Sequence, residues 1–267
     1  MRNATKIFLF GFLISTAATA SALAQEDASW IQKVKNFFKR PAAEQTQSVE
    51  EVKTEEKTQA QAPAKKISFD FSEKTIGNRE APLKINIFTS LTCPHCTGVH
   101  TQLLPYLQEK YVDTNQALII LTDFPLEQRA MTASMVSRCL TGDNYFAFME
   151  TLFENQSSWS GAPDIQESLL PYAKLAGLTQ EEMTACATDE AASKVIIRQR
   201  NLTIMRYKIH ATPTILLQLG KEKDRIEEAP SRTDIDQKIE KLKQSYKGLW
   251  PAETETAETE EIKPTAP

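Results

Sequence analysis

Runs of apolar residues in the middle of the chain predict three strands. Residues 83–88 alternate between apolar and polar positions, which is typical of a strand with one buried face. Residues 117–121 form a continuous apolar run, which indicates a strand buried on both faces. Residues 214–219 predict a third strand, which follows a long stretch of the chain without strand patterns.

The remaining apolar positions follow helical spacing. Residues 126–206 predict several helices, one of which begins with a capping box formed by Thr179 and Glu182. A final helix is predicted by an apolar stripe of Ile235, Ile239, Leu242 and Tyr246. This order of elements predicts an α/β domain with a helical insertion over about residues 126–195.

The N-terminus carries the pattern of a secretory signal peptide. Arg2 and Lys6 precede an uncharged apolar run over residues 7–20, and a small-x-small cleavage pattern ends at Ala24. We expect residues 1–24 to be removed, which would place the mature chain in an oxidising compartment where disulfides persist. The alternative is an uncleaved membrane anchor, for which this apolar run is short.

Charge and composition divide the rest of the chain into blocks. The 267 residues carry a net charge of −4, which argues against a general nucleic-acid-binding protein. Residues 41–66 are rich in Glu, Gln, Ala and Thr, and we expect a disordered linker there. Residues 249–267 carry five Glu and one Lys and predict an acidic disordered tail. Residues 67–248 hold most of the aromatic residues and predict the folded domain.

Residues 25–40 form a basic amphipathic segment. An apolar face is predicted at helical spacing by Trp30, Ile31, Val34, Phe37 and Phe38. Residues 28–40 carry four basic residues and no acidic residue. The segment is therefore interpreted either as a membrane-surface or partner-binding helix, or as a helix that packs on the protein's own core or on a second copy.

Cys93-Pro94-His95-Cys96 lies where the first predicted strand ends and a helix begins. At this position the unpaired N–H groups and the dipole of the helix stabilise the thiolate of Cys93 and lower its pKa. Pro94 suits the first helical turn because it has no N–H. A protonated His95 would add a stabilising charge. Cys96, one turn further along, is predicted to be the buried resolving thiol.

Two other interpretations of the Cys-x-x-Cys motif stay open. A zinc site would need two more ligands, and Cys139 and Cys186 stand 47 residues apart with no second Cys-x-x-Cys. An inert structural disulfide between Cys93 and Cys96 would close too small a loop to add much stability. We therefore expect neither a metal nor another cofactor. Cys139 and Cys186 are predicted to form a structural disulfide, with two buried free thiols as the alternative.

The chain resembles the periplasmic thiol:disulfide interchange proteins of the DsbA/DsbG group. The resemblance spans roughly residues 67–247 and rests on five segments: Thr75–Asn78, Ala81–Phe88, Cys93–Cys96, Asp123–Leu126 and Ala211–Thr214. It implies a thioredoxin fold with an inserted α-helical domain. It also implies a cis Thr212–Pro213 bond that faces the cysteines and binds an extended substrate segment.

Two positions depart from the pattern of that group. Members often carry a buried acidic residue six positions before the first cysteine, where this chain has Ile87. Thr212 precedes the proline, as is commoner among isomerase-like members. His100, on the predicted active-site helix, is interpreted as a surface or packing residue. His210 is a candidate for tuning Cys93 electrostatically.

The expected function is that of an exported, periplasmic oxidase that transfers the Cys93–Cys96 disulfide to cysteine-containing proteins. The resemblance implies a membrane-bound, quinone-linked partner that reoxidises the pair, and residues 30–40 are a candidate membrane-surface or self-association segment. A disulfide isomerase or reductase is the alternative. A non-enzymatic metal-binding or adaptor protein with the same fold is a third possibility.

Overall fold

The computed structural model describes residues 67–248 and 250–251, all within the unit Gln59–Pro267. The predicted signal peptide (1–24), basic segment (25–40), linker (41–66) and most of the tail (249–267) lie outside the described residues. Among the described residues, no helix combines the length and the apolar character that a membrane span requires.

The described residues form a five-stranded mixed sheet with the order β1-β3-β2-β4-β5. The three predicted strands are confirmed as β2 (Leu83–Thr89), β3 (Ala117–Asp123) and β4 (Thr214–Leu219). β2 pairs in parallel with β3, and the other pairs are antiparallel. The edge strands β1 (Lys74–Gly77) and β5 (Glu222–Glu227) were not predicted, because β1 is short and β5 is mostly charged.

One face of the sheet is covered by two helical stretches. The first runs from Pro94 to Val112 as alternating α- and π-helical segments: α3 (Pro94–Gly98), η1 (Val99–Leu103), α4 (Leu104–Leu107) and η2 (Gln108–Val112). The second is α11 (Arg232–Ser245). Among the described residues, the largest buried cluster fills the space between these helices and β2, β3 and β4. The sequence correctly places Ile235, Ile239 and Leu242 in this core, but Tyr246 lies just beyond the end of α11.

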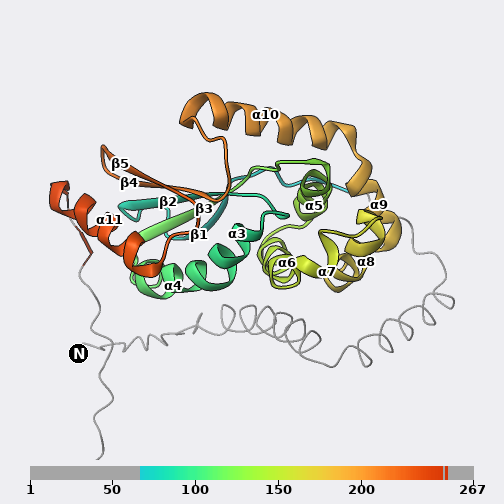
Figure 1. Cartoon of the computed structure of the whole chain (residues 1–267), viewed down its shortest axis with the longest axis horizontal. Helices are drawn as coiled ribbons and strands as arrows, with labels where there is room; N and C mark the ends of the chain where they lie inside the picture. The colour runs from blue at the N-terminus through green and yellow to red at the C-terminus, as the bar shows by residue number, and fades with distance from the viewer. Residues whose placement is uncertain (1–66, 249, 252–267) are drawn as a thin grey trace, which may run out of the picture. The chain divides into compact units, whose positions relative to one another are not determined.

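The predicted helical insertion consists of α5 to α9, which gather beyond one end of the sheet (Figure 1). Their bounds are α5 (Gln128–Arg138), α6 (Asp143–Glu154), α7 (Gln156–Trp159), α8 (Ile165–Leu175) and α9 (Gln180–Thr188). The capping box of Thr179 and Glu182 is present at the start of α9, as predicted. Apart from the two edge strands, the order of α and β elements predicted from the sequence is therefore confirmed.

The long helix α10 (Glu190–Tyr207) leads from the insertion back to the sheet. It lies on the side of the sheet opposite α3, α4 and α11 (Figure 1). Ile204 and Tyr207 pack there against a cluster of Phe88, Phe124 and Ile209. Because α10 is continuous, residue 195, the expected end of the insertion, falls inside a helix.

Candidate active site

Cys93 lies at the N-terminus of α3, where the chain leaves β2. Its backbone is extended (φ −77°, ψ 118°), and its N–H donates to the carbonyl of Ser90 at 3.0 Å. Pro94 takes the first helical position, where a missing N–H costs nothing. The helix therefore begins at the motif, as the sequence predicts.

The two cysteines of the motif differ in exposure. Both are free thiols; Cys93 is 8% exposed and Cys96 is fully buried. Pro94 and His95 are exposed between them. A substrate can therefore approach Cys93, while Cys96 is reachable only from inside the site.

The surroundings of Cys93 stabilise its thiolate. A hydrogen bond from the Cys96 side chain contributes most and helps to lower the pKa of Cys93 to about 5, against the opposing effect of burial. The Thr212 side chain and the backbone N–H groups of Cys96 and His95 also lower this pKa. His95 thus acts on the thiolate through its main chain, whereas its sequence position suggested a role for the imidazole.

Cys96 is shifted in the opposite direction. Its hydrogen bond to Cys93 and its burial raise the pKa of Cys96 far above the ordinary value, while the Thr89 hydroxyl and the Ser90 backbone partly oppose the rise. One thiol of the pair is therefore ionised at neutral pH and the other keeps its proton. This division suits Cys93 as nucleophile and leaving group, and Cys96 as resolving thiol.

The loop before β4 reaches Cys93 from a distant part of the sequence. The Thr212–Pro213 bond is cis, as the resemblance implies. The Cys93 thiol donates to the carbonyl of Thr212 at 3.2 Å. Pro213 is buried, whereas Thr212 is partly exposed beside the cysteine. In this thiol form, the hydroxyl of Thr212 is buried without a hydrogen-bond partner among the described residues; ionisation of Cys93 would supply an acceptor.

Gln156 ties the helical insertion to the motif, and no local pattern predicts this role. Its side-chain amide donates to the carbonyls of Leu91 (2.8 Å) and Cys93 (3.0 Å), and all these groups are buried. The turn that presents Cys93 is therefore held by a residue of α7 as well as by α3.

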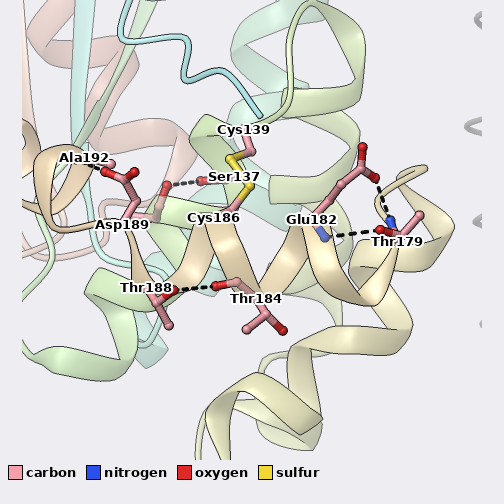
Figure 2. Close-up of a disulfide and its surroundings, with 10 residues drawn as sticks. Ser137, Cys139, Thr179, Glu182, Thr184, Cys186, Thr188, Asp189 and Ala192 are labelled. Atoms are coloured by element: carbon pink, nitrogen blue, oxygen red, sulfur yellow. Dashed lines mark hydrogen bonds between the residues drawn. A yellow bond between two sulfur atoms is a disulfide. The ribbon is translucent and has the colours of Figure 1, made fainter. Parts of the chain in front are cut away.

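The second pair of cysteines forms a disulfide between the end of α5 and α9. Cys139 and Cys186 are 6.2 Å apart at Cα (Figure 2). The neighbouring Arg138 is buried and contacts a carboxylate oxygen of Asp123 at 2.6 Å. The Tyr145 hydroxyl donates to the other oxygen of that carboxylate at 3.3 Å. The Cys139–Cys186 disulfide is therefore part of the packing of the insertion.

The other positions considered from the sequence fall into three environments. Ile87 is fully buried in the sheet and offers no proton. His210 is exposed. His100 is 4% exposed, so it packs in the interior, and its ring stacks on Phe153 with centroids 3.9 Å apart. Among the described residues, no cluster of three or more His, Cys, Asp or Glu side chains is arranged to hold a metal.

Comparisons with known proteins agree with this geometry. A family model described as Thioredoxin matches residues 70–241. Two rickettsial relatives carry the name "Putative protein-disulfide oxidoreductase". The Rickettsia bellii chain is 28% identical over 57% of this chain and 60% of its own length. The Rickettsia typhi chain is 26% identical over 72% of each chain. This chain thus spans about 60% of the first relative.

A solved structure gives the same picture. The crystal structure of Wolbachia pipientis alpha-DsbA1 is 27% identical and covers 71% of this chain and 96% of its own, with a TM-score of 0.59. The sheet, the motif at the start of α3 and the helices inserted between β3 and β4 are therefore those of a thioredoxin fold with an inserted helical domain. The chain belongs to the thioredoxin family, and its fold is similar to that of a DsbA-like protein.

Proposed function

We propose that this chain is an exported protein-disulfide oxidoreductase that acts as an oxidase and donates the Cys93–Cys96 disulfide to cysteine-containing proteins. The observation that carries the proposal is the opposite shift of the two thiol pKa values, to about 5 for Cys93 and upward for Cys96. Thiolate exists only in the reduced protein. Each unit by which its pKa is lowered favours the reduced form by about 1.4 kcal/mol. The protein therefore tends to give its disulfide away.

The reaction proceeds by two exchange steps. A substrate thiolate attacks Sγ of Cys93, a mixed disulfide forms, and the electron pair of the broken bond passes to Sγ of Cys96. A second substrate thiolate then attacks the substrate sulfur of the mixed disulfide and releases Cys93 as a thiolate. The substrate leaves with a disulfide, and the enzyme keeps two electrons on Cys93 and Cys96.

Thr212 and Pro213 are proposed to hold the substrate segment beside Cys93. Thr212 is partly exposed and its carbonyl lies 3.2 Å from Sγ of Cys93, which the substrate thiolate attacks. Its backbone can pair with an extended peptide, while Pro213 has no N–H that would compete for the sulfurs. We expect substrates to be recognised through their main chain and therefore to vary in sequence.

The oxidase needs an acceptor that restores its disulfide. We propose a membrane-bound, quinone-linked reoxidase, with export to the periplasm through cleavage after Ala24. Residues 30–40 would keep the enzyme near the membrane or join two copies. Deletion of residues 30–40 is expected to reduce membrane association or oligomer mass; an unchanged distribution and mass would contradict this role.

A disulfide isomerase or reductase is the second candidate. It is favoured by Thr212, whose residue type before the proline is commoner among isomerase-like members of the group. The reduction potential of Cys93–Cys96, measured by equilibrium with glutathione, distinguishes the two. We expect about −120 mV, the value of a strong oxidant. A potential of about −200 mV or below would contradict the oxidase and favour the second candidate.

A further inference from the structure

His100 is a buried histidine that the exchange steps above do not use. It lies in the π-helical segment η1, four residues after Cys96, and is 4% exposed. Its ring stacks on Phe153 of α6 at an interplanar angle of 13°, and its Nε2 lies 3.1 Å from Oγ1 of Thr89. Both the plane of the ring and one of its nitrogens are thus held in place.

Thr89 connects this histidine to the resolving thiol. It is the last residue of β2 and is 2% exposed. Its hydroxyl is hydrogen-bonded to Cys96 and lowers the pKa of that thiol. A hydroxyl offers one proton and two lone pairs, so Thr89 can donate to the Cys96 sulfur while it accepts from His100. The Thr89 hydroxyl thus stands between the His100 ring and the Cys96 thiol.

Cys96 needs such a connection because its proton must come and go in each cycle. When the Cys93–Cys96 bond breaks, Cys96 leaves as a thiolate in a fully buried position, where an isolated charge is costly. When the bond forms again, the thiol must lose its proton before it attacks Cys93. Ile87 of β2 is fully buried and apolar and offers no proton, so the proton needs another route.

His100, the residue of this group farthest from Cys96 along the proposed path, lines a pocket. The pocket has a volume of about 100 Å³ and is also lined by Gln108 of η2 and Glu150 of α6. A volume of about 100 Å³ is large enough for several water molecules. Glu150 and His100 are the titratable side chains that line the pocket. Burial lowers the pKa of His100 to about 3, so its imidazole is neutral at neutral pH and can donate at one nitrogen while accepting at the other.

We propose that Thr89 and His100 form a proton relay that serves Cys96. As the Cys93–Cys96 bond breaks, Thr89 gives its proton to Sγ of Cys96 and takes the Nε2 proton of His100. Solvent in the pocket supplies a proton to Nδ1. When the disulfide forms again, each proton moves back. The oxidised enzyme thus carries the Nε2–H tautomer and the reduced enzyme the Nδ1–H tautomer.

This relay rests on disulfide exchange at Cys93–Cys96, but not on whether the protein works as an oxidase or a reductase. A failed oxidase proposal would appear in the reduction potential and leave the relay kinetics unchanged. The two proposals can therefore fail separately.

The test is the rate at which reduced glutathione attacks the oxidised, full mature protein, followed by stopped flow. His100→Phe keeps the stacking on Phe153, and Thr89→Val keeps the shape of the side chain; each removes the relay. Because positioned proton transfer contributes about 10²–10⁴-fold to catalysis, we expect each variant to be slowed at least tenfold. The double variant should be no slower than either single variant, since both break the same relay.

Two controls separate the relay from general damage. The Oγ1 atom of Thr97, beside Cys96, is buried without a partner among the described residues, so Thr97→Val should react within twofold of the wild type. Thr89→Ser restores the hydroxyl and should recover most of the rate. If folded His100→Phe and Thr89→Val both react within twofold of the wild type, or if their losses multiply in the double variant, the relay is wrong.

A second measurement does not depend on variants. Nitrogen-15 shifts of the His100 ring in the labelled wild type report which nitrogen carries the proton. We expect a change from Nε2–H to Nδ1–H when the enzyme is reduced. The same tautomer in both redox states would overturn the proposal.

Discussion

The two cysteine pairs of this protein have the same chemistry and opposite surroundings. Cys93 and Cys96 lie at the start of α3, where the chain leaves β2, and polar groups stabilise a thiolate on Cys93. Cys139 and Cys186 join two helices of the insertion across 47 residues, with Cys186 fully buried. A short loop with a stabilised thiolate favours exchange, whereas a long loop in a packed interior favours stability.

The largest expected difference is in catalysis. Cys93→Ser removes the sulfur that the substrate thiolate attacks and should abolish oxidation of a reduced model protein, leaving the uncatalysed rate. The matched variant Cys139→Ala/Cys186→Ala should keep activity within about twofold of the wild type when assayed well below its unfolding temperature. Residual turnover by Cys93→Ser, or a large loss of activity in Cys139→Ala/Cys186→Ala, would contradict the view that only the first pair is catalytic.

Stability should respond in the opposite way. Closing a 47-residue span contributes about 4 kcal/mol in the chain-entropy estimate. We expect the unfolding free energy of Cys139→Ala/Cys186→Ala, measured with urea, to fall by about this amount. For Cys93→Ala/Cys96→Ala the loss relative to the oxidised wild type should be smaller, at most about 2 kcal/mol, because the loop is much shorter and the readily donated disulfide adds little to the stability of the fold. Equal losses would contradict the comparison.

The effect of pH on the reduced protein sharpens the contrast. The pKa of Cys93 falls from an ordinary value of 9.0 to about 5 in the folded state, so ionisation stabilises the reduced fold. This contribution is fully present above pH 9 and is lost as the pH falls through 5. The stability of the reduced form, relative to the oxidised form, should therefore rise between pH 5 and 9 in unfolding experiments. If the difference in unfolding free energy between the reduced and oxidised forms stayed constant over this range, the Cys93 thiolate would not be stabilised by the fold.

A smaller effect is expected at the loop before β4. Thr212→Val removes the hydroxyl that lowers the pKa of Cys93 but keeps the backbone carbonyl and the shape of the side chain. One hydrogen bond to a charged group contributes about 1.5 kcal/mol, so the pKa of Cys93 should rise by about one unit. Thiolate absorbance at 240 nm measures this shift. An unchanged pKa would leave Thr212 with only its backbone role.

Much of this contrast could be predicted from the sequence. The alternation over residues 83–88 and the position of Cys93 before a helix located the reactive pair, because local patterns determine both. The strands at the two edges were missed, because few of their residues are buried and their pairing depends on neighbours far away in the chain.

The supporting residues of the site were harder to predict. The Gln156 side chain donates to the carbonyl of Cys93, and the His100 ring on η1 is hydrogen-bonded to the Thr89 hydroxyl on β2. Neither contact has a local signature, because each joins residues that only the tertiary fold brings together. Thr212 was found through its place beside Pro213 in a recognisable motif, rather than through any periodicity.

The most direct test of the central claim is a titration of the reduced protein. Absorbance at 240 nm should show one thiolate appearing with a midpoint near pH 5, and the step should be absent in Cys93→Ser and unchanged in Cys139→Ala/Cys186→Ala. A midpoint near 9.0, the ordinary value, would contradict the account, because Cys93 would then have no more thiolate character than an isolated cysteine.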